Sequence, residues 1–169
     1  MGSSARDALV PTGRRVIVTG ARGGIGAATV ELLEEAGCTV AACDVEDFDI
    51  RDRAAVDAGV AALAERLGGC DAVVANAGVV DTIHRAERFS GEDWRRDVET
   101  NLSGQFNVVR AAFEPLRSSG DGRVVIVSSA SAETACPARW PTRRRRQASS
   151  AWPAPSPPSG VRTGSAATS

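Results

Sequence analysis

The sequence predicts an α/β fold, in which short buried strands alternate with helices. Three observations lead to this prediction. Residues 16–18 form an apolar β-branched run, which is typical of a buried strand. Glycines follow at positions 20, 24 and 26, and a helical pattern then continues to about Ala36. Further apolar runs and helical patterns alternate as far as residue 127, as expected for a parallel sheet covered by helices.

The turn between the first strand and the first helix has the composition of an anion-binding site. Glycine lets the backbone turn tightly and lets a pyrophosphate approach closely. The free N–H groups at the start of a helix, together with the helix dipole, attract negative charge. We therefore expect Gly20, Gly24, Ile25 and Gly26 to bind a dinucleotide. A glycine-rich turn without a ligand is the alternative.

The second strand, expected over residues 38–43, ends at Asp44, which lies 18 residues after Gly26. A carboxylate at this place accepts hydrogen bonds from the ribose hydroxyls of NAD and repels the 2′-phosphate of NADP. The alternative for Asp44 is a solvated loop acid. Arg22, inside the glycine turn, favours NADP instead, because a basic residue there could meet a 2′-phosphate. The pattern as a whole favours NAD over NADP.

Four further elements follow. Residues 53–67 are expected to form a helix whose core positions recur at helical spacing, namely Val56, Val60, Leu63 and Leu67. A third strand is expected over residues 71–75, and a last strand, buried on both faces, over residues 124–127. Between them, residues 92 to about 116 are expected to form one long helix with an apolar face made of Trp94, Val98, Leu102, Phe106 and Val109.

The motifs and their order resemble the short-chain dehydrogenase/reductase family. T-G-x-x-x-G-x-G begins at Thr19, N-A-G at Asn76, N-x-x-G at Asn101, and a pair of serines at Ser128. The resemblance covers about residues 14–134. It implies a Rossmann-like, doubly wound parallel sheet of strand order 3-2-1-4-5 that is incomplete at its C-terminal end. It also implies NAD(P)-dependent hydride transfer between the cofactor and a small alcohol or ketone.

The resemblance assigns further residues to the cofactor. Asp49 and Ile50 match a short step that touches the adenine ring, although a surface-loop acid is an almost equal alternative for Asp49. Asn76, Ala77 and Gly78 match the loop that passes beside the cofactor, where the asparagine amide ties neighbouring strands together. An ordinary turn at the end of a strand is the alternative for these three residues.

The resemblance also names catalytic residues, and two of them are missing. Asn101 would hold a water in a proton relay, or would be purely structural, and Ser129 would bind the substrate oxygen. The family's general base is a Tyr about 13 residues after that Ser, with a Lys four residues further on. Thr142 and Arg146 occupy those positions, and the chain contains neither Tyr nor Lys. Threonine is too weak an acid and arginine stays protonated, so we expect impaired catalysis.

Composition changes after residue 134. Residues 1–134 hold 14 Arg and 21 acidic residues, a net charge of −7, whereas residues 135–169 hold six Arg and no acid. The second segment contains six of the eight prolines and no Leu, Ile, Met or Phe. We therefore divide the chain into a flexible lead-in (1–13), a dinucleotide-binding domain (14–134) and a tail expected to be disordered (135–169). A nucleic-acid or localisation patch at residues 143–146 is the rival interpretation.

A lost nucleotide would explain the tail. With GC-rich codons, restoring one G before the codon of Ala135 yields Y-x-x-x-K, with the Tyr where Thr142 stands and the Lys where Arg146 stands. Because the codons are chosen, this shows compatibility with a frameshift. The hypothesis leaves the strand at residues 124–127 poorly covered, which is an aggregation hazard.

Composition excludes several functional classes. The net charge of −1 points to neither nucleic acid nor membrane, and no apolar run reaches transmembrane length. The four cysteines have no C-x-x-C spacing and His84 is the single histidine, so we expect no metal site and free thiols in a reducing cytoplasm. The resemblance also implies a homo-oligomer that acts on a small alcohol or ketone. The alternatives to an enzyme are a non-catalytic dinucleotide-binding module and a non-functional product.

Overall fold

The computed structural model describes residues 12–80, 86–129 and 161–166. In these ranges the chain forms one parallel sheet of five strands in the order β2-β1-β3-β4-β5. The strands are β1 (Arg15–Thr19), β2 (Thr39–Cys43), β3 (Ala72–Ala75), β4 (Gly122–Val127) and β5 (Val161–Ala166). The predicted α/β fold with a parallel, doubly wound sheet is confirmed.

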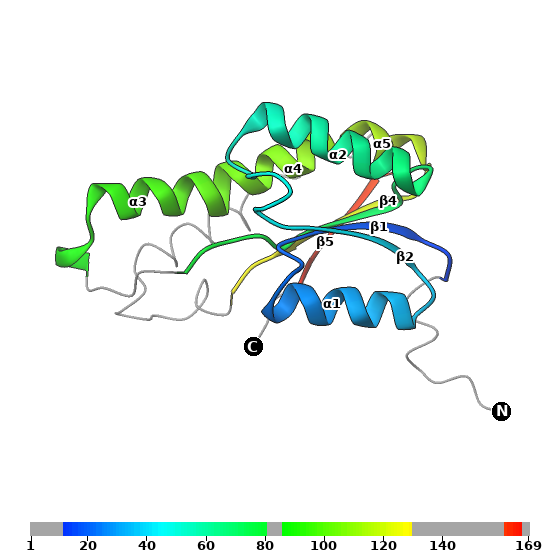
Figure 1. Cartoon of the computed structure of the whole chain (residues 1–169), viewed down its shortest axis with the longest axis horizontal. Coiled ribbons are helices and arrows are strands. Elements are labelled where there is room, and N and C mark those ends of the chain that lie inside the picture. The colour runs from blue at the N-terminus through cyan, green and yellow to red at the C-terminus, as the bar shows by residue number, and fades with distance from the viewer. Residues whose placement is uncertain (1–11, 81–85, 130–160, 167–169) are drawn as a thin grey trace.

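Helices cover both faces of the sheet. α1 (Gly24–Glu35) lies on one face, and α2 (Arg53–Leu67), α4 (Gln105–Ala111) and α5 (Phe113–Ser118) lie on the other (Figure 1). α3 (Gly91–Val98) follows a short 3₁₀ turn (Ala86–Arg88) and extends beyond the sheet. Alternate residues of β1 supply the two halves of the core. Ile17 belongs to the core cluster between the sheet and the helices α2 and α4. Val16 and Val18 belong to the cluster between the sheet and α1.

The predicted strand order 3-2-1-4-5 is wrong, because β2 is the outermost strand on its side of the described sheet. Residues 44–52 lead directly from β2 into α2, so no strand forms outside β2. The chain still extends the sheet in opposite directions from β1. β2 pairs with one edge of β1, whereas β3 pairs with the other edge and β4 follows β3. Ligands of open α/β sheets bind in the crevice at such a switch point, beyond the carboxyl ends of the strands.

The single helix expected over residues 92–116 is interrupted. A π-helix (Glu99–Gly104) separates α3 from α4, and α5 begins after Ala112. Part of the apolar face predicted for this region points outward, since Trp94 and Phe106 are each 43% exposed, whereas Val109 packs against the core. The buried side also carries polar residues, including Asp97 and Asn101.

β5 lies within the segment that we expected to be disordered. It pairs with β4 along its length, from Gly122 opposite Val161 to Val127 opposite Ala166. β4 is therefore not the exposed edge that the sequence led us to expect. Thr142, Arg146, His84 and the Arg143–Arg146 run lie outside the described residues, as does most of the predicted lead-in. The frameshift hypothesis stays a prediction.

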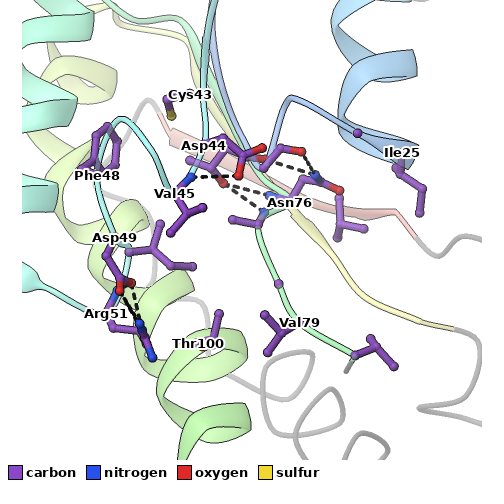
Figure 2. A pocket seen from close by; sticks show the side chains of 18 of the residues that line it. Ile25, Cys43, Asp44, Val45, Phe48, Asp49, Arg51, Asn76, Val79 and Thr100 are labelled. Carbon is purple, nitrogen blue, oxygen red and sulfur yellow. Dashed lines mark hydrogen bonds and ion pairs between the residues drawn. The ribbon is translucent and has the colours of Figure 1, made fainter. Parts of the chain in front are cut away.

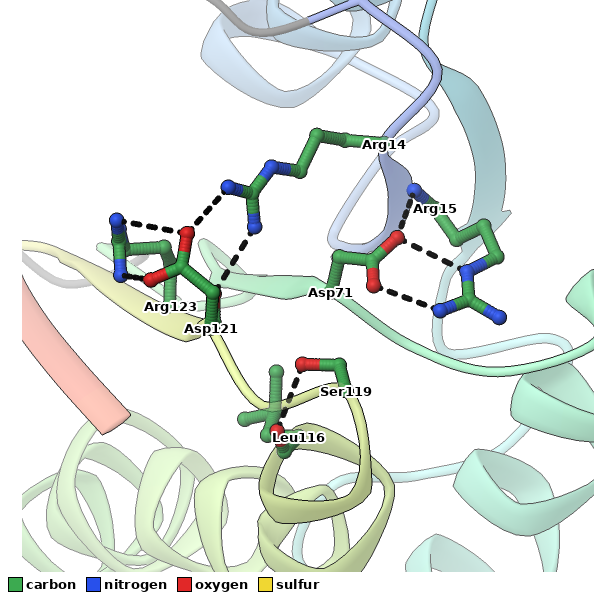
Figure 3. A network of polar contacts seen from close by, with 7 residues as sticks. All are labelled: Arg14, Arg15, Asp71, Leu116, Ser119, Asp121 and Arg123. Atoms are coloured by element: carbon green, nitrogen blue, oxygen red, sulfur yellow. Dashed lines mark hydrogen bonds and ion pairs between the residues drawn. The ribbon is translucent and has the colours of Figure 1, made fainter. Parts of the chain in front are cut away.

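Ion pairs fasten the amino ends of three strands, at the end of the sheet away from the switch-point crevice. Arg15 binds Asp71 through its backbone N–H at 2.8 Å and through Nε and Nη2 at 2.9 and 2.7 Å (Figure 3). Asp121 accepts hydrogen bonds from both Arg14 and Arg123. These contacts join the starts of β1, β3 and β4. Arg15 and Arg14 lower the pKa of Asp71 and Asp121 respectively, and Arg123 adds to the effect on Asp121.

Within the described ranges, none of the helices has the length and apolar character needed to span a bilayer. The same residues contain no grouping of three His, Cys, Asp or Glu side chains placed to ligate a metal ion.

Candidate dinucleotide site

The carboxyl ends of β1 to β4 surround a cavity of about 660 Å³ (Figure 2). It brings together residues from the glycine turn, the loop after β2, the N-A-G loop and the end of β4. The predicted residues that line it are Gly20, Ile25, Asp44, Asp49, Ile50, Asn76, Ala77, Gly78 and Ser129. The structure thus places on one cavity residues that are up to 109 positions apart in the sequence. The remaining predicted residues, Arg22, Gly24, Gly26 and Asn101, do not line it.

The glycine turn is too crowded for side chains at two positions. Gly20 has a φ of +64°, and a Cβ there would lie 2.7 Å from Cα of Ala77. A Cβ on Gly26 would lie 1.9 Å from the carbonyl oxygen of Gly20. Gly23 precedes α1, and no side chain caps this helix. The N–H groups of Gly26 and Ala27 donate to the carbonyl oxygen of Gly23 at 3.1 and 3.3 Å. An anion would supply an acceptor for the preceding N–H groups at the start of α1.

Asn76 joins the glycine turn to the end of β3. Its Nδ2 donates to the carbonyl oxygens of Thr19 and Gly20 at 3.1 and 2.9 Å. In return, the hydroxyl of Thr19 accepts from the backbone N–H groups of Asn76 and Ala77 at 3.2 and 3.1 Å. Thr19 is 1% exposed, and sequence reasoning gave it no role beyond opening the motif. The N-A-G loop and the glycine turn are therefore fixed against each other.

Asp44 directly follows β2 and lies at the cavity wall. Its Oδ2 accepts from the backbone N–H of Arg22 at 2.9 Å, and its Oδ1 accepts from that of Val45 at 2.8 Å. A carboxylate can accept about four hydrogen bonds, so acceptor sites remain for hydroxyl donors. The side chain of Arg22 forms ion pairs with Glu46 and Asp47.

Asp49 forms a bidentate ion pair with Arg51 on the cavity wall, with Oδ2 at 2.5 Å from Nη2 (Figure 2). These hydrogen bonds hold the pKa of Asp49 below its usual value. The neighbouring Ile50 is 8% exposed, and its carbonyl oxygen accepts from Nδ2 of Asn107 on α4 at 3.0 Å. This bond fixes the loop after β2 to the helical layer.

The side chain of Asn101 binds the backbone of Val79. Its Oδ1 accepts from the N–H of Val79 at 2.8 Å, and its Nδ2 donates to the carbonyl oxygen of Val79 at 2.7 Å. Asn101 lies in the π-helix and is 1% exposed. Its amide is therefore engaged in holding the wall of the cavity, which is the structural alternative stated above. The proton-relay role stays a prediction.

Ser129 lines the cavity two residues after the end of β4. Several lining residues were missed by sequence reasoning, namely Thr19, Cys43, Val45, Phe48, Arg96 and Thr100. Thr19 was recoverable as the first letter of its motif, and Val45 as the neighbour of Asp44. Burial raises the pKa of Cys43 to about 12, so its thiol is uncharged near neutral pH.

Residues 45–140 match the model of the short chain dehydrogenase family. The chain belongs to this family. It is 40% identical over 106 residues to an uncharacterised oxidoreductase of Mycobacterium tuberculosis, a match that covers 62% of this chain and 36% of that protein. It is 37% identical over 136 residues to cis-4-hydroxycyclohexanecarboxylate dehydrogenase of Sinomonas cyclohexanicum, covering 69% of this chain and 55% of that protein.

The fold is also similar to that of solved structures. Carveol dehydrogenase from Mycobacterium avium, whose crystal structure is a complex with NAD, matches with a TM-score of 0.75 at 24% identity. That match covers 80% of this chain and 61% of the other chain. The chain spans between about a third and about half of the length of the two curated relatives described above.

Proposed function

We propose that this chain binds NAD in the cavity at the carboxyl ends of β1 to β4, with NADP the less favoured cofactor. The observation that carries the proposal is that Asp44 and the glycine turn border the same cavity. The turn would hold the pyrophosphate against the start of α1, and Asp44 would accept hydrogen bonds from the adenosine ribose. Asp49 and Ile50 would contact the adenine ring.

The residues present fit a dinucleotide. A Cβ on Gly20 or Gly26 would collide with protein atoms, so these glycines let the turn fold tightly against itself and the N-A-G loop. A Cβ on Gly23 or Gly24 would meet nothing within 4 Å, so the turn is open on that side to phosphate oxygens. The bonds between Asn76 and Thr19 hold the N-A-G loop in place before any ligand arrives. A preformed site of this kind loses less conformational entropy on binding. Several polar groups converge on a cavity of about 660 Å³, within the usual range for cofactor sites.

For catalysis, the family chemistry is oxidation of an alcohol or reduction of a ketone. A nicotinamide cofactor bound in this cavity would supply the acceptor for the hydride of the alcohol carbon. Ser129 would hold the substrate oxygen and Asn101 would support a proton relay. The hydroxyl proton needs a base, and Thr142 and Arg146 stand where a Tyr and a Lys would supply it. Loss of general acid/base catalysis costs on the order of 10²–10⁴ in rate, so we propose that the chain as written is a family oxidoreductase whose catalysis is too impaired to give measurable turnover.

A non-catalytic dinucleotide-binding module is the second candidate. It is favoured by the contrast between complete cofactor-binding motifs and the absence of both Tyr and Lys. Both candidates bind small molecules. Cys38, Cys43 and Cys70 of the described residues are buried and form no disulfide, which suits a reducing cytoplasm. Assembly into a homo-oligomer, as in the family, and action on a small alcohol or ketone are likewise proposals for this chain.

Titration calorimetry of the full chain with NAD tests binding, and production of NADH from simple secondary alcohols tests catalysis. We expect saturable binding that is weakened by Asp44→Ala, with no turnover above the blank. Steady turnover would support the enzyme over the module. Absence of binding by a folded, monodisperse chain would overturn the proposal. Glu114→Gln, on the exposed surface of α5, is the control, because its ion pair with Arg117 lies away from the cavity lining.

A further inference from the structure

The guanidinium of Arg22 is held by two acids that follow Asp44. Nη1 lies 3.3 Å from Oε2 of Glu46, and Nη2 lies 3.2 Å from Oδ2 of Asp47. These side chains are between 43% and 60% exposed. Exposed ion pairs of this kind contribute little to stability, so their effect on the fold is small.

The same residues join the glycine turn to the end of β2. Oδ2 of Asp47 accepts from the backbone N–H of Asp44 at 2.8 Å, while Oδ2 of Asp44 accepts from the backbone N–H of Arg22 at 2.9 Å. Three carboxylates and one guanidinium therefore gather beside the wall where Asp44 meets the cavity, with a net charge of −2.

We infer that Glu46 and Asp47 determine cofactor selectivity by withholding Arg22 from a 2′-phosphate. This rests on the proposed function, because it requires the adenosine ribose to lie beside Asp44. An arginine that faced the cavity unpaired would bind a phosphate through its planar fork. Here that fork is already occupied by carboxylates. The two acids also add negative charge next to Asp44, which repels a phosphate dianion further.

The double variant Glu46→Gln with Asp47→Asn tests the inference. Both changes keep side-chain size, and the amide oxygen of the Asp47→Asn side chain can still accept from the N–H of Asp44. We expect the ratio of NADP affinity to NAD affinity to rise roughly 10- to 100-fold, from lost repulsion and a released guanidinium. Adding Arg22→Gln should remove most of that gain. Calorimetry with each nucleotide on the full chain gives the ratio.

The outcomes separate this inference from the function on which it rests. Binding of neither nucleotide by the folded wild-type chain overturns the proposed function and this inference together. Binding of NAD with an unchanged ratio in the double variant overturns the inference alone. A gain that Arg22→Gln leaves undiminished also overturns it, because the released guanidinium would then contribute nothing to binding of the phosphate. Glu114→Gln removes one negative charge away from the cavity lining and should leave the ratio unchanged. Circular dichroism checks that each variant is folded. If the double variant does not fold, the affinity ratio is measured on the single variant Glu46→Gln instead.

Discussion

The side-chain amide of Asn101 pairs with the backbone of Val79 in both directions, accepting from its N–H at 2.8 Å and donating to its carbonyl oxygen at 2.7 Å. A side chain on a π-helix thus supplies the two bonds that a neighbouring strand would supply. Val79 borders the cavity, so the position of this wall depends on one buried amide. Single π-turns inside α-helices often occur at functional sites, and here the turn brings Asn101 to the loop.

Asn101→Ala should lower the free energy of unfolding by roughly 2–4 kcal/mol, because two backbone groups of Val79 lose buried partners. Urea denaturation at neutral pH measures this change. Asn101→Asp keeps an acceptor for the N–H but faces the carbonyl oxygen with a carboxylate, so we expect it to destabilise as well. An unchanged midpoint in both variants would contradict the structural role.

Gly26→Ala should destabilise the chain by about 1–3 kcal/mol or more, because the new Cβ meets the backbone of Gly20, which cannot move cheaply. It should also abolish NAD binding. Gly91→Ala is the matched control, since a Cβ there meets nothing within 4 Å and Gly91 begins α3. We expect that control to be neutral or slightly stabilising. Equal effects at the two positions, measured by thermal unfolding, would refute the steric argument.

The pairing with Arg15 makes stability depend on pH through Asp71. The hydrogen bonds lower the pKa of Asp71 in the folded state, so the stabilisation is present above the unfolded pKa of about 4 and is lost as pH falls through the lowered value. Asp71→Asn should cost about 1–3 kcal/mol at pH 7, and the difference from wild type should shrink below about pH 4.

Urea denaturation between pH 7 and pH 2.5 checks the prediction for Asp71. Asp121→Asn provides the comparison, because the carboxylate of Asp121 is 49% exposed and solvent screens its ion pairs. We expect a smaller change for that variant. The prediction would be contradicted if the difference in the free energy of unfolding between wild type and Asp71→Asn widened as the pH fell.

The frameshift hypothesis predicts a specific DNA result. Reading codons 130–150 from fresh template should reveal one additional G before the codon of Ala135, which would place a Tyr at position 142 and a Lys at position 146. Expression of that corrected gene should restore hydride transfer, measured as NADH formation. If the reading frame stands as written, the question becomes whether the chain binds NAD without turnover.

Local signals predicted most of the fold. β-branched runs and glycines located β1, α1, α2 and β3 to within a residue or two, because each signal depends on a few adjacent residues. The strand order could not be obtained in this way. It was taken from the family resemblance, and the short connection at residues 44–52 leaves no segment to form a strand outside β2.

The interrupted helix shows a second limit. Apolar spacing identifies a helix face but not the side of the molecule that it meets. Here Trp94 and Phe106 face outward, whereas Asn101 and Asn107 are buried because they bond to the loops at Val79 and Ile50. Those partners lie 22 and 57 residues away, beyond the reach of any local pattern. The same is true of Arg22, whose acidic partners only the folded chain brings together.

The two ends of the sheet are held by different chemistry. Arg15, Asp71 and Asp121 fasten the strand starts through charge, whereas Thr19 and Asn76 fasten the cofactor end through groups that do not titrate. Mild acid should therefore fray the strands from their amino ends first. In hydrogen exchange, amides near Arg15 and Arg123 should lose protection before those of Asn76 and Ala77. The carboxyl end of the sheet, which borders the cavity, would then stay folded at a lower pH than the amino end.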